Sequence, residues 1–234
     1  MPAEIILQKL FLVSDPERAA TQQCYFKTGK GQYAEGDVML GVTTPLVKKI
    51  VKETSPLSFA EIQTLLDSRY HEARMVGLQL LVKQFQKTQD ENGQQKVFDF
   101  YLKNARKANN WDLVDASCPK IVGAWLLDKT DRSVLYHMAK SDNLWEQRIA
   151  IVATWMFIKH GQLDDTLHIA EKLLSHKHDL IHKATGWMLR EVGKKNKAVL
   201  IGFLDVHRSK MPRTMLRYAI ERFSAAERSH FMRK

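Results

Sequence analysis

Apolar side chains recur at the three- and four-residue steps of an amphipathic helix along nearly the whole chain of 234 residues. Between Glu72 and Phe85, for example, Ala73, Val76 and Leu80 form one such stripe. The same spacing returns in four further segments: Leu144–Phe157, Leu167–Leu174, Leu180–Val192 and Met215–Phe223. No segment shows the strict apolar–polar alternation of a strand. The sequence therefore predicts an all-α fold.

A degenerate repeat runs through the helical pattern. Four helix-opening segments place a basic residue ahead of small and apolar side chains: Arg74, Arg148, Lys183 and Arg217. The period is about 34–37 residues, with Trp111 at the skipped position. Helical hairpins of this length stack into solenoids, in which one repeat position faces one surface. We expect a curved α-solenoid of HEAT-like helical-hairpin repeats. Because no low-complexity linker divides the chain, residues 1–234 are predicted to form a single HEAT-like repeat domain.

The charge of the chain points to a polyanionic partner. Lys and Arg number 36 against 26 Asp and Glu, which gives a formal net charge of +10. Such an excess favours nucleic acid first and an anionic membrane second. A stripe of cations one repeat apart suits a phosphate backbone, although a solvated basic helix face is the alternative.

Neither a membrane span nor a disulfide framework is expected. No run of 18 apolar residues occurs, and the apolar start of the chain, which contains Glu4 and Lys9, is interpreted as a first helix and not as a signal peptide. Cys24 and Cys118 stand far apart in the sequence and form neither a disulfide framework nor a metal-binding cluster. We interpret them as unreactive thiols in a reducing cytoplasm. A cytoplasmic location is therefore expected.

Two segments combine tryptophan with charged residues. Trp111 and Asp115 are i and i+4, so they share a helix face, and Asp112 stands three residues before Asp115. A carboxylate on a DNA-binding face repels phosphate, so its presence there suggests another role. The alternative to such a functional face is a Trp packed in the core and an Asp paired with an Arg of the next repeat.

The second segment is basic. Lys183, Trp187 and Arg190 share one helix face, and Gly186 leaves room for close backbone approach. Lys194 and Lys195 extend the basic patch. Among the other tryptophans, Trp145 stands beside Arg148 and is assigned to the same functional face, whereas Trp125 and Trp155 lie in apolar runs and are expected in the core.

A face of Trp and Asp suits the cleavage of an N-glycosidic bond. Aromatic faces attract cations and stack on exposed bases. Glycosidic cleavage passes through an oxocarbenium-like sugar and commonly uses carboxylates. A purine alkylated at N3 or N7 already carries a positive charge, so no acid is needed to protonate it. One Asp and one or two Trp could then suffice.

At these residues the sequence resembles the bacterial DNA alkylation-repair glycosylases of the AlkD type, which are built of HEAT-like repeats. The matching stretches are NNWDLVDASCP (109–119), SDNLWEQRIAI (141–151), IHKATGWMLREVGKKNK (181–197) and, near the start, CYFKTGKGQYAEGDVMLGV (24–42). The resemblance implies that Trp111, Asp115 and Trp187 form a catalytic cleft, that Arg148 holds the phosphate beside the lesion and that Tyr25 lies against the DNA near this cleft. Further DNA contacts are predicted for the basic patch: Lys183, Arg190, Lys194 and Lys195.

The resemblance also implies an activity. Members of the family excise cationic 3-methyladenine and 7-methylguanine from double-stranded DNA and leave an abasic site, without the usual extrusion of the base. The chain departs from the family at Asn110, where a second Trp is common, and in the Thr28–Asp37 loop, which puts the substrate range in doubt. A monomer without cofactor is expected.

Two other functions stay open at this point. The first is a non-catalytic HEAT-like module that binds damaged or branched nucleic acid, and the second is a protein–protein scaffold. A metal site is not expected, because no Cys, His or carboxylate spacing matches one. The histidines that cluster around one repeat are His168, His176, His178 and His182.

Overall fold

The computed structural model describes residues 2–233, and most of these are helical. Helices account for 69% of the chain, and within residues 2–233 the extended structure amounts to one isolated bridge, between Val38 and Tyr70. The predicted fold class, all-α and of the solenoid type, is confirmed. Contacts divide the chain into two compact units, Met1–Ser117 and Cys118–Lys234. That the whole chain forms a single domain of HEAT-like repeats stays a prediction.

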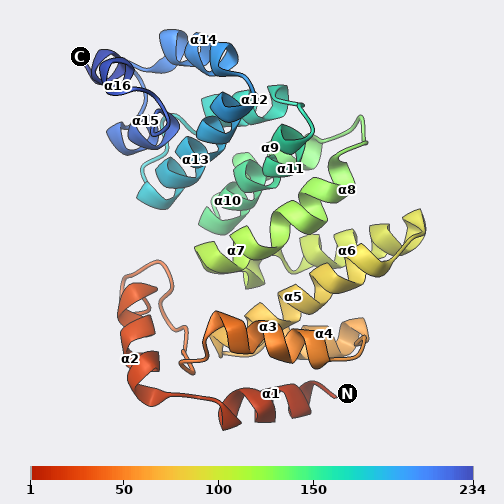
Figure 1. Cartoon of the computed structure of the whole chain (residues 1–234). Coiled ribbons are helices and arrows are strands. Elements are labelled where there is room, and N and C mark those ends of the chain that lie inside the picture. The colour runs from red at the N-terminus through yellow and green to blue at the C-terminus, as the bar shows by residue number, and fades with distance from the viewer. Residues whose placement is uncertain (1, 234) are drawn as a thin grey trace. The chain divides into compact units, whose positions relative to one another are not determined.

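The first unit is arranged around one long helix, α5, which packs against its neighbours α3, α4 and α6 (Figure 1). The bounds of its helices are α1 (Ala3–Leu12), α2 (Pro16–Tyr25), α3 (Thr44–Glu53), α4 (Phe59–Leu66), α5 (His71–Lys87), α6 (Glu91–Lys103), a 3₁₀ turn (Ala105–Lys107) and α7 (Trp111–Cys118).

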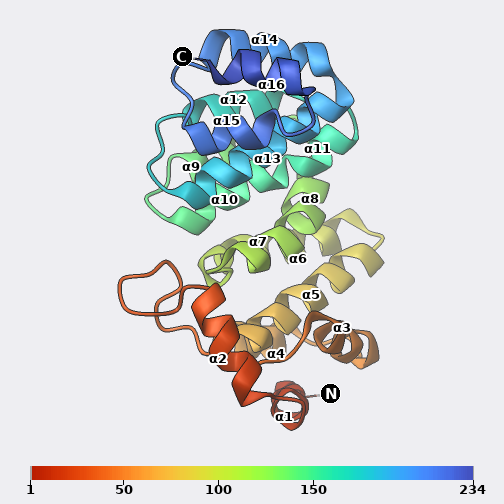
Figure 2. The ribbon, with the colours of Figure 1, turned by 60° about the vertical axis from the view of Figure 1, so that its left-hand side comes forward.

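In the second unit the helices stack in two rows. Helices α10, α13 and α15 pack side by side, while α9 and α12 pack behind α10 and α13 (Figure 2). The bounds are a π-helical turn (Pro119–Gly123), α8 (Ala124–Leu126), α9 (Ser133–Ala139), α10 (Leu144–Ala153), α11 (Trp155–Lys159), α12 (Asp164–Lys172), α13 (Asp179–Lys195), α14 (Lys197–His207), α15 (Arg213–Ala219) and α16 (Ala225–Met232).

Side-chain caps decide where several helices begin. Ser58 and Glu61 at α4, and Ser224 and Glu227 at α16, form capping boxes, in which each side chain satisfies a backbone N–H of the other residue. Single polar caps start five other helices by accepting a backbone N–H of the first turn: Asp15, Asp90, Asn143, His178 and Asn196.

The helical periodicity located the long helices, but local chemistry changed two boundaries. The segments Glu72–Phe85 and Leu180–Val192 lie inside α5 and α13, as predicted. Leu144–Phe157 is broken after Ala153, where the buried Thr154 hydroxyl donates to the carbonyl of Ile151 at 2.7 Å. The polar stretch KTQDENGQQK (87–96) is typical of a loop between helices, but Gly93 lies in the first turn of α6, because Asp90 accepts its N–H at 2.7 Å.

The loop between α2 and α3 is fastened to its surroundings at its second half. Gly41 has a φ of +77°, and a Cβ at this position would meet the carbonyl oxygen of Asp15 at 2.1 Å. Only glycine fits such a position. The buried carboxylate of Glu72 accepts the N–H groups of Leu40 and Val42 at 2.9–3.1 Å. Residues 38–42 are thus held against the start of α5.

Gly186 allows α13 and α15 to approach closely, as the sequence suggested. A Cβ at Gly186 would stand 2.5 Å from the carbonyl oxygen of Met215 and 2.5 Å from the Cβ of Tyr218. A larger side chain at Gly186 would push the main chain of α15 away and disturb the packing of α10, α13 and α15.

We expect Gly186→Ala to lower the free energy of unfolding by about 1–3 kcal/mol, because the added methyl group overpacks this contact. Gly202→Ala in α14 is the matched control, since its Cβ meets nothing within 4 Å. The control is expected to raise stability by about 0.5–1 kcal/mol through helix propensity. Urea unfolding followed by circular dichroism measures both, and an unchanged or raised stability of Gly186→Ala would contradict the close packing.

Candidate functional site

Trp111 lies in a cluster of aromatic rings in the first unit. It is the first residue of α7 and is half-buried. The ring of Phe26 stacks on it, with centroids 5.5 Å apart and an angle of 25° between the planes. Tyr25, which is 64% exposed, presents its ring edge-on at 6.0 Å. The sequence placed Tyr25 near Trp111 through the family resemblance but missed Phe26, the residue that supports the indole face.

The two carboxylates of α7 differ in their surroundings. Asp112 accepts the N–H of Leu113 at 2.9 Å through one oxygen and contacts His71 at 2.9 Å through the other. Both of its oxygens are therefore engaged in holding the structure. Asp115, one turn beyond Trp111, is half-buried and not enclosed in the core. Trp111 is half-buried as well, so its indole is not enclosed in the core, while the other part of that alternative, an Asp115–Arg pair, stays a prediction.

A buried network of charges lies behind the aromatic cluster. His71 Nδ1 is 3.2 Å from Asp37, and Arg74 donates to the other oxygen of Asp37 at 2.5 Å. Asn109 donates to the same Asp37 oxygen at 2.8 Å. Burial raises the pKa of Asp37, but the contacts with His71, Arg74 and Asn109 outweigh it and hold this pKa below its usual value.

The same contacts act on His71. Burial lowers the pKa of its imidazole. The hydrogen bonds with Asp112 and Asp37 and the charge of Asp112 outweigh this effect and raise the pKa to about 9. A pKa raised in this way favours the protonated form of His71 at neutral pH. No pattern in the sequence distinguished this histidine, because its partners come from positions 34 and 41 residues away.

In the second unit, Trp187 of α13 is half-buried and the basic side chains around it carry acidic partners. Lys183 pairs with Asp179 at 2.7 Å, and Lys194 pairs with Glu191 at 2.7 Å. Arg190 donates to Glu221, in the turn that follows α15. Lys195 is exposed. The predicted basic patch is present on α13, and acidic neighbours interleave with it.

The predicted stripe of cations is wrong at Arg74. Its side chain is 5% exposed and bound to Asp37 and to the carbonyl of Ser68, because a buried guanidinium needs a counter-charge and acceptors. Arg148 is also buried and donates to the carbonyl of Leu180 at 2.8 Å. Arg217 is exposed. The contact of Arg148 with phosphate stays a prediction.

The sequence also misplaced three other tryptophans. Trp145, assigned to the functional face, is 6% exposed and belongs to the core. Trp125 and Trp155, assigned to the core, are half-buried, with the ammonium groups of Lys129 and Lys159 over their rings at 4.3 and 5.7 Å. The apolar runs around these two residues concealed that each indole lies at a surface and is covered by a lysine.

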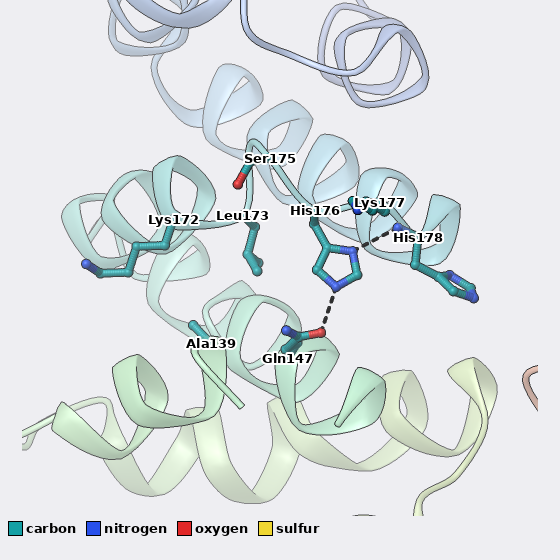
Figure 3. Close-up of a pocket in the computed structure, with 8 residues that line it drawn as sticks. All are labelled: Ala139, Gln147, Lys172, Leu173, Ser175, His176, Lys177 and His178. Carbon is teal, nitrogen blue, oxygen red and sulfur yellow. Dashed lines mark hydrogen bonds between the residues drawn. The ribbon is translucent and has the colours of Figure 1, made fainter. Parts of the chain in front are cut away.

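The histidine-rich turn before α13 lines an open pocket of about 550 Å³ (Figure 3). His176 uses both ring nitrogens: Nε2 contacts Gln147 at 2.8 Å and Nδ1 accepts the N–H of His178 at 3.0 Å. Figure 3 shows the side chains of Lys172 and His178 leaving the pocket on opposite sides. Burial holds the pKa of His176 below its usual value. The pocket therefore has no group of side chains that converges on a ligand.

Over residues 2–233, no cluster of three or more His, Cys, Asp or Glu side chains has the arrangement needed for a metal ion. None of the helices in this range combines the length and the apolar character needed to cross a bilayer.

An all-helical chain of the solenoid type with a charge of +10 is compatible with a helical-repeat protein that acts on nucleic acid. The family model described as DNA alkylation repair enzyme matches residues 6–223, and the chain belongs to this family. It is thus an enzyme of alkylation DNA repair, with DNA as its substrate.

A solved structure supports the fold. The chain is similar to a protein described as a predicted DNA alkylation repair enzyme from Enterococcus faecalis, with a TM-score of 0.69 and 21% sequence identity. The similarity covers 91% of this chain and 97% of that chain. Among proteins of curated function, none matches the sequence significantly.

We expect Phe26→Ala to change the environment of Trp111, because the mutation removes the ring that stacks on the indole. The shift of the Trp111 indole N–H signal in the ¹H–¹⁵N spectrum measures this change. Phe100→Ala is the matched control: Phe100 is a half-buried ring of the same unit that stacks on Phe59 at 4.7 Å. If both variants moved the Trp111 signal equally, the specific stacking of Phe26 on Trp111 would be refuted.

Proposed function

We propose that the protein is a DNA N-glycosylase that releases cationic N3- or N7-alkylated purines, such as 3-methyladenine and 7-methylguanine, from double-stranded DNA and leaves an abasic site. The observation that carries the proposal is the Trp111–Asp115 pair on one face of α7, in which both residues are half-buried and Phe26 stacks on the indole. The indole face suits a cationic base, and the carboxylate suits the sugar cation that remains when the base departs.

The proposed reaction needs no general acid to protonate the leaving base. An alkylated purine leaves as a neutral base, because its positive charge is lost when the glycosidic bond breaks. The developing charge then lies on the sugar, where the carboxylate of Asp115 stabilises it and positions the attacking water. Asp112 is unsuited to this role, because His71 and the N–H of Leu113 occupy its oxygens.

Contacts with DNA are proposed for residues of both units. Tyr25 is exposed beside Trp111 and supports a contact near the lesion. Trp187 completes the catalytic set in the proposal, and the cations of α13, with Arg148, hold phosphates: Lys183, Arg190, Lys194 and Lys195. One lesion needs one cleft, so the proposed enzyme acts as a monomer, without a cofactor. The proposed location is the cytoplasm.

We expect Asp115→Asn to slow the release of 7-methylguanine by about 10²–10³-fold, since the amide keeps the shape but removes the negative charge that stabilises the sugar cation. Binding to undamaged duplex should change little. Single-turnover release of the free base from methylated duplex, alongside a binding isotherm, measures both.

Release at the wild-type rate by Asp115→Asn would show that this carboxylate has no catalytic role. A wild-type protein that binds duplex tightly and releases no base would favour the non-catalytic DNA-binding module instead.

Lys183→Ala is expected to weaken binding to damaged and undamaged duplexes equally and to reduce the slope of log K against log salt by about one. Lys183 is chosen over Arg148 because its side chain is 41% exposed, so its loss should not unfold the protein. Lys197→Ala, a 51% exposed lysine paired with Glu227 outside the proposed set, is the control and should leave the slope unchanged. Equal slopes for wild type and Lys183→Ala would remove Lys183 from the interface.

A further inference from the structure

His71 lies between two carboxylates that come from other parts of the first unit. Its Nδ1 is 3.2 Å from an oxygen of Asp37, and its Nε2 is 2.9 Å from an oxygen of Asp112. Ionised carboxylates only accept hydrogen bonds, and a neutral imidazole has only one N–H to donate. Both contacts are therefore hydrogen bonds only when His71 is an imidazolium, with a proton on each nitrogen.

The charges of this cluster balance only in that state. Asp37 and Asp112 contribute two negative charges, and Arg74 contributes one positive charge. The imidazolium supplies the second positive charge. The side chains of His71, Asp37 and Arg74 are each 4–5% exposed, so a lost proton would leave an uncompensated negative charge largely away from water.

The cluster touches the proposed catalytic pair at two points. Asp112 follows Trp111 directly in α7 and precedes Asp115 by less than one turn. The ring of Phe26 lies between His71, at a centroid distance of 5.1 Å, and Trp111, at 5.5 Å. The imidazolium thus holds both the start of α7 and the ring on which the indole stacks.

We propose that Asp37, His71 and Asp112 are positioning residues that keep Trp111 and Asp115 in place only while His71 is doubly protonated. The effect on catalysis rests on the proposed function, whereas the effect on the position of Trp111 does not. No substrate contact is assigned to these three residues.

The groups that face His71 set the pH at which the network fails. They are Asp37 from the α2–α3 loop, Asp112 from α7 and Arg74 from α5; Glu72, the next residue in α5, is turned to the N–H groups of residues 40 and 42. With the pKa of His71 raised from 6.5 to about 9, its stabilising effect is complete below pH 6.5. The effect falls as the pH rises towards 9 and is lost above that value.

The wild-type protein provides the first test. In the full chain labelled with ¹⁵N at histidine and tryptophan, the His71 ring nitrogens should give imidazolium signals at pH 7.5 and titrate with a midpoint near 9. The Trp111 indole signal should move with the same midpoint. His71→Gln and Trp111→Phe assign the two signals. A neutral His71 at pH 7.5, or a Trp111 signal that ignores the titration, would overturn the proposal.

Asp112→Asn provides the second test, because it removes one charge that holds the proton. The His71 midpoint should fall by at least one unit, and base release at pH 8.5 should fall at least about threefold, in proportion to the protonated fraction of His71. Release should recover at pH 6, where His71 is protonated in the variant as well. A merely misfolded variant would show no such rescue.

Asp165→Asn is the matched control. Asp165 bridges Arg132 and Tyr136 in the second unit, and its side chain is 18% exposed, against 19% for Asp112. This variant should leave the His71 titration and the pH profile unchanged. If wild type releases no base at any pH, the proposed function fails, while the titration of His71 and Trp111 still decides whether the network positions the indole.

Discussion

The first unit depends on the compensation of one buried carboxylate, that of Asp37. An ionised group in this position costs several kcal/mol unless opposite charge and hydrogen bonds surround it. Arg74 and His71 from α5 supply the charge, and Asn109 supplies an amide donor. Because these partners lie on separate elements, satisfying one carboxylate fixes the α2–α3 loop, the start of α5 and the residues that lead into α7. The aromatic cluster around Trp111 is built on that fixed base.

The sequence predicted what depends on short-range spacing. Helical periodicity located α5 and α13, and the i, i+4 relation placed Trp111 and Asp115 on one face of α7. It could not separate Arg74, which is buried against Asp37, from Arg217, which is exposed, since both follow the same local pattern. The reason is physical: burial is set by which distant segment covers a residue. The same limit explains why the core position of Trp145 was missed.

Two aspartates three residues apart on α7 illustrate how environment assigns roles to identical groups. Asp112 gives one oxygen to His71 and the other to a backbone N–H, so its orientation is fixed. Asp115, one turn beyond Trp111, is half-buried, and the proposed function assigns it to the sugar of the substrate. A carboxylate that stabilises a sugar cation must stay ionised and fixed in space. Asp112, held rigidly in the same turn of α7, helps to fix the position of Asp115.

The acidic partners of the α13 cations bear on how a repair enzyme meets DNA. Exposed ion pairs such as Lys183–Asp179 and Lys194–Glu191 contribute only about 0–1 kcal/mol each, so exchanging the carboxylate for a phosphate costs little. If α13 contacts DNA as proposed, the carboxylates stay close to the exchanged lysines and repel the phosphate backbone, which lowers the affinity for undamaged duplex. An enzyme that must find rare lesions among a large excess of normal sites gains from this limit, because tight non-specific binding would slow its transfer along DNA. The interleaving of acids with the basic residues of α13 is therefore compatible with DNA as the substrate, and it explains why a net charge of +10 does not appear as an uninterrupted basic surface on this helix.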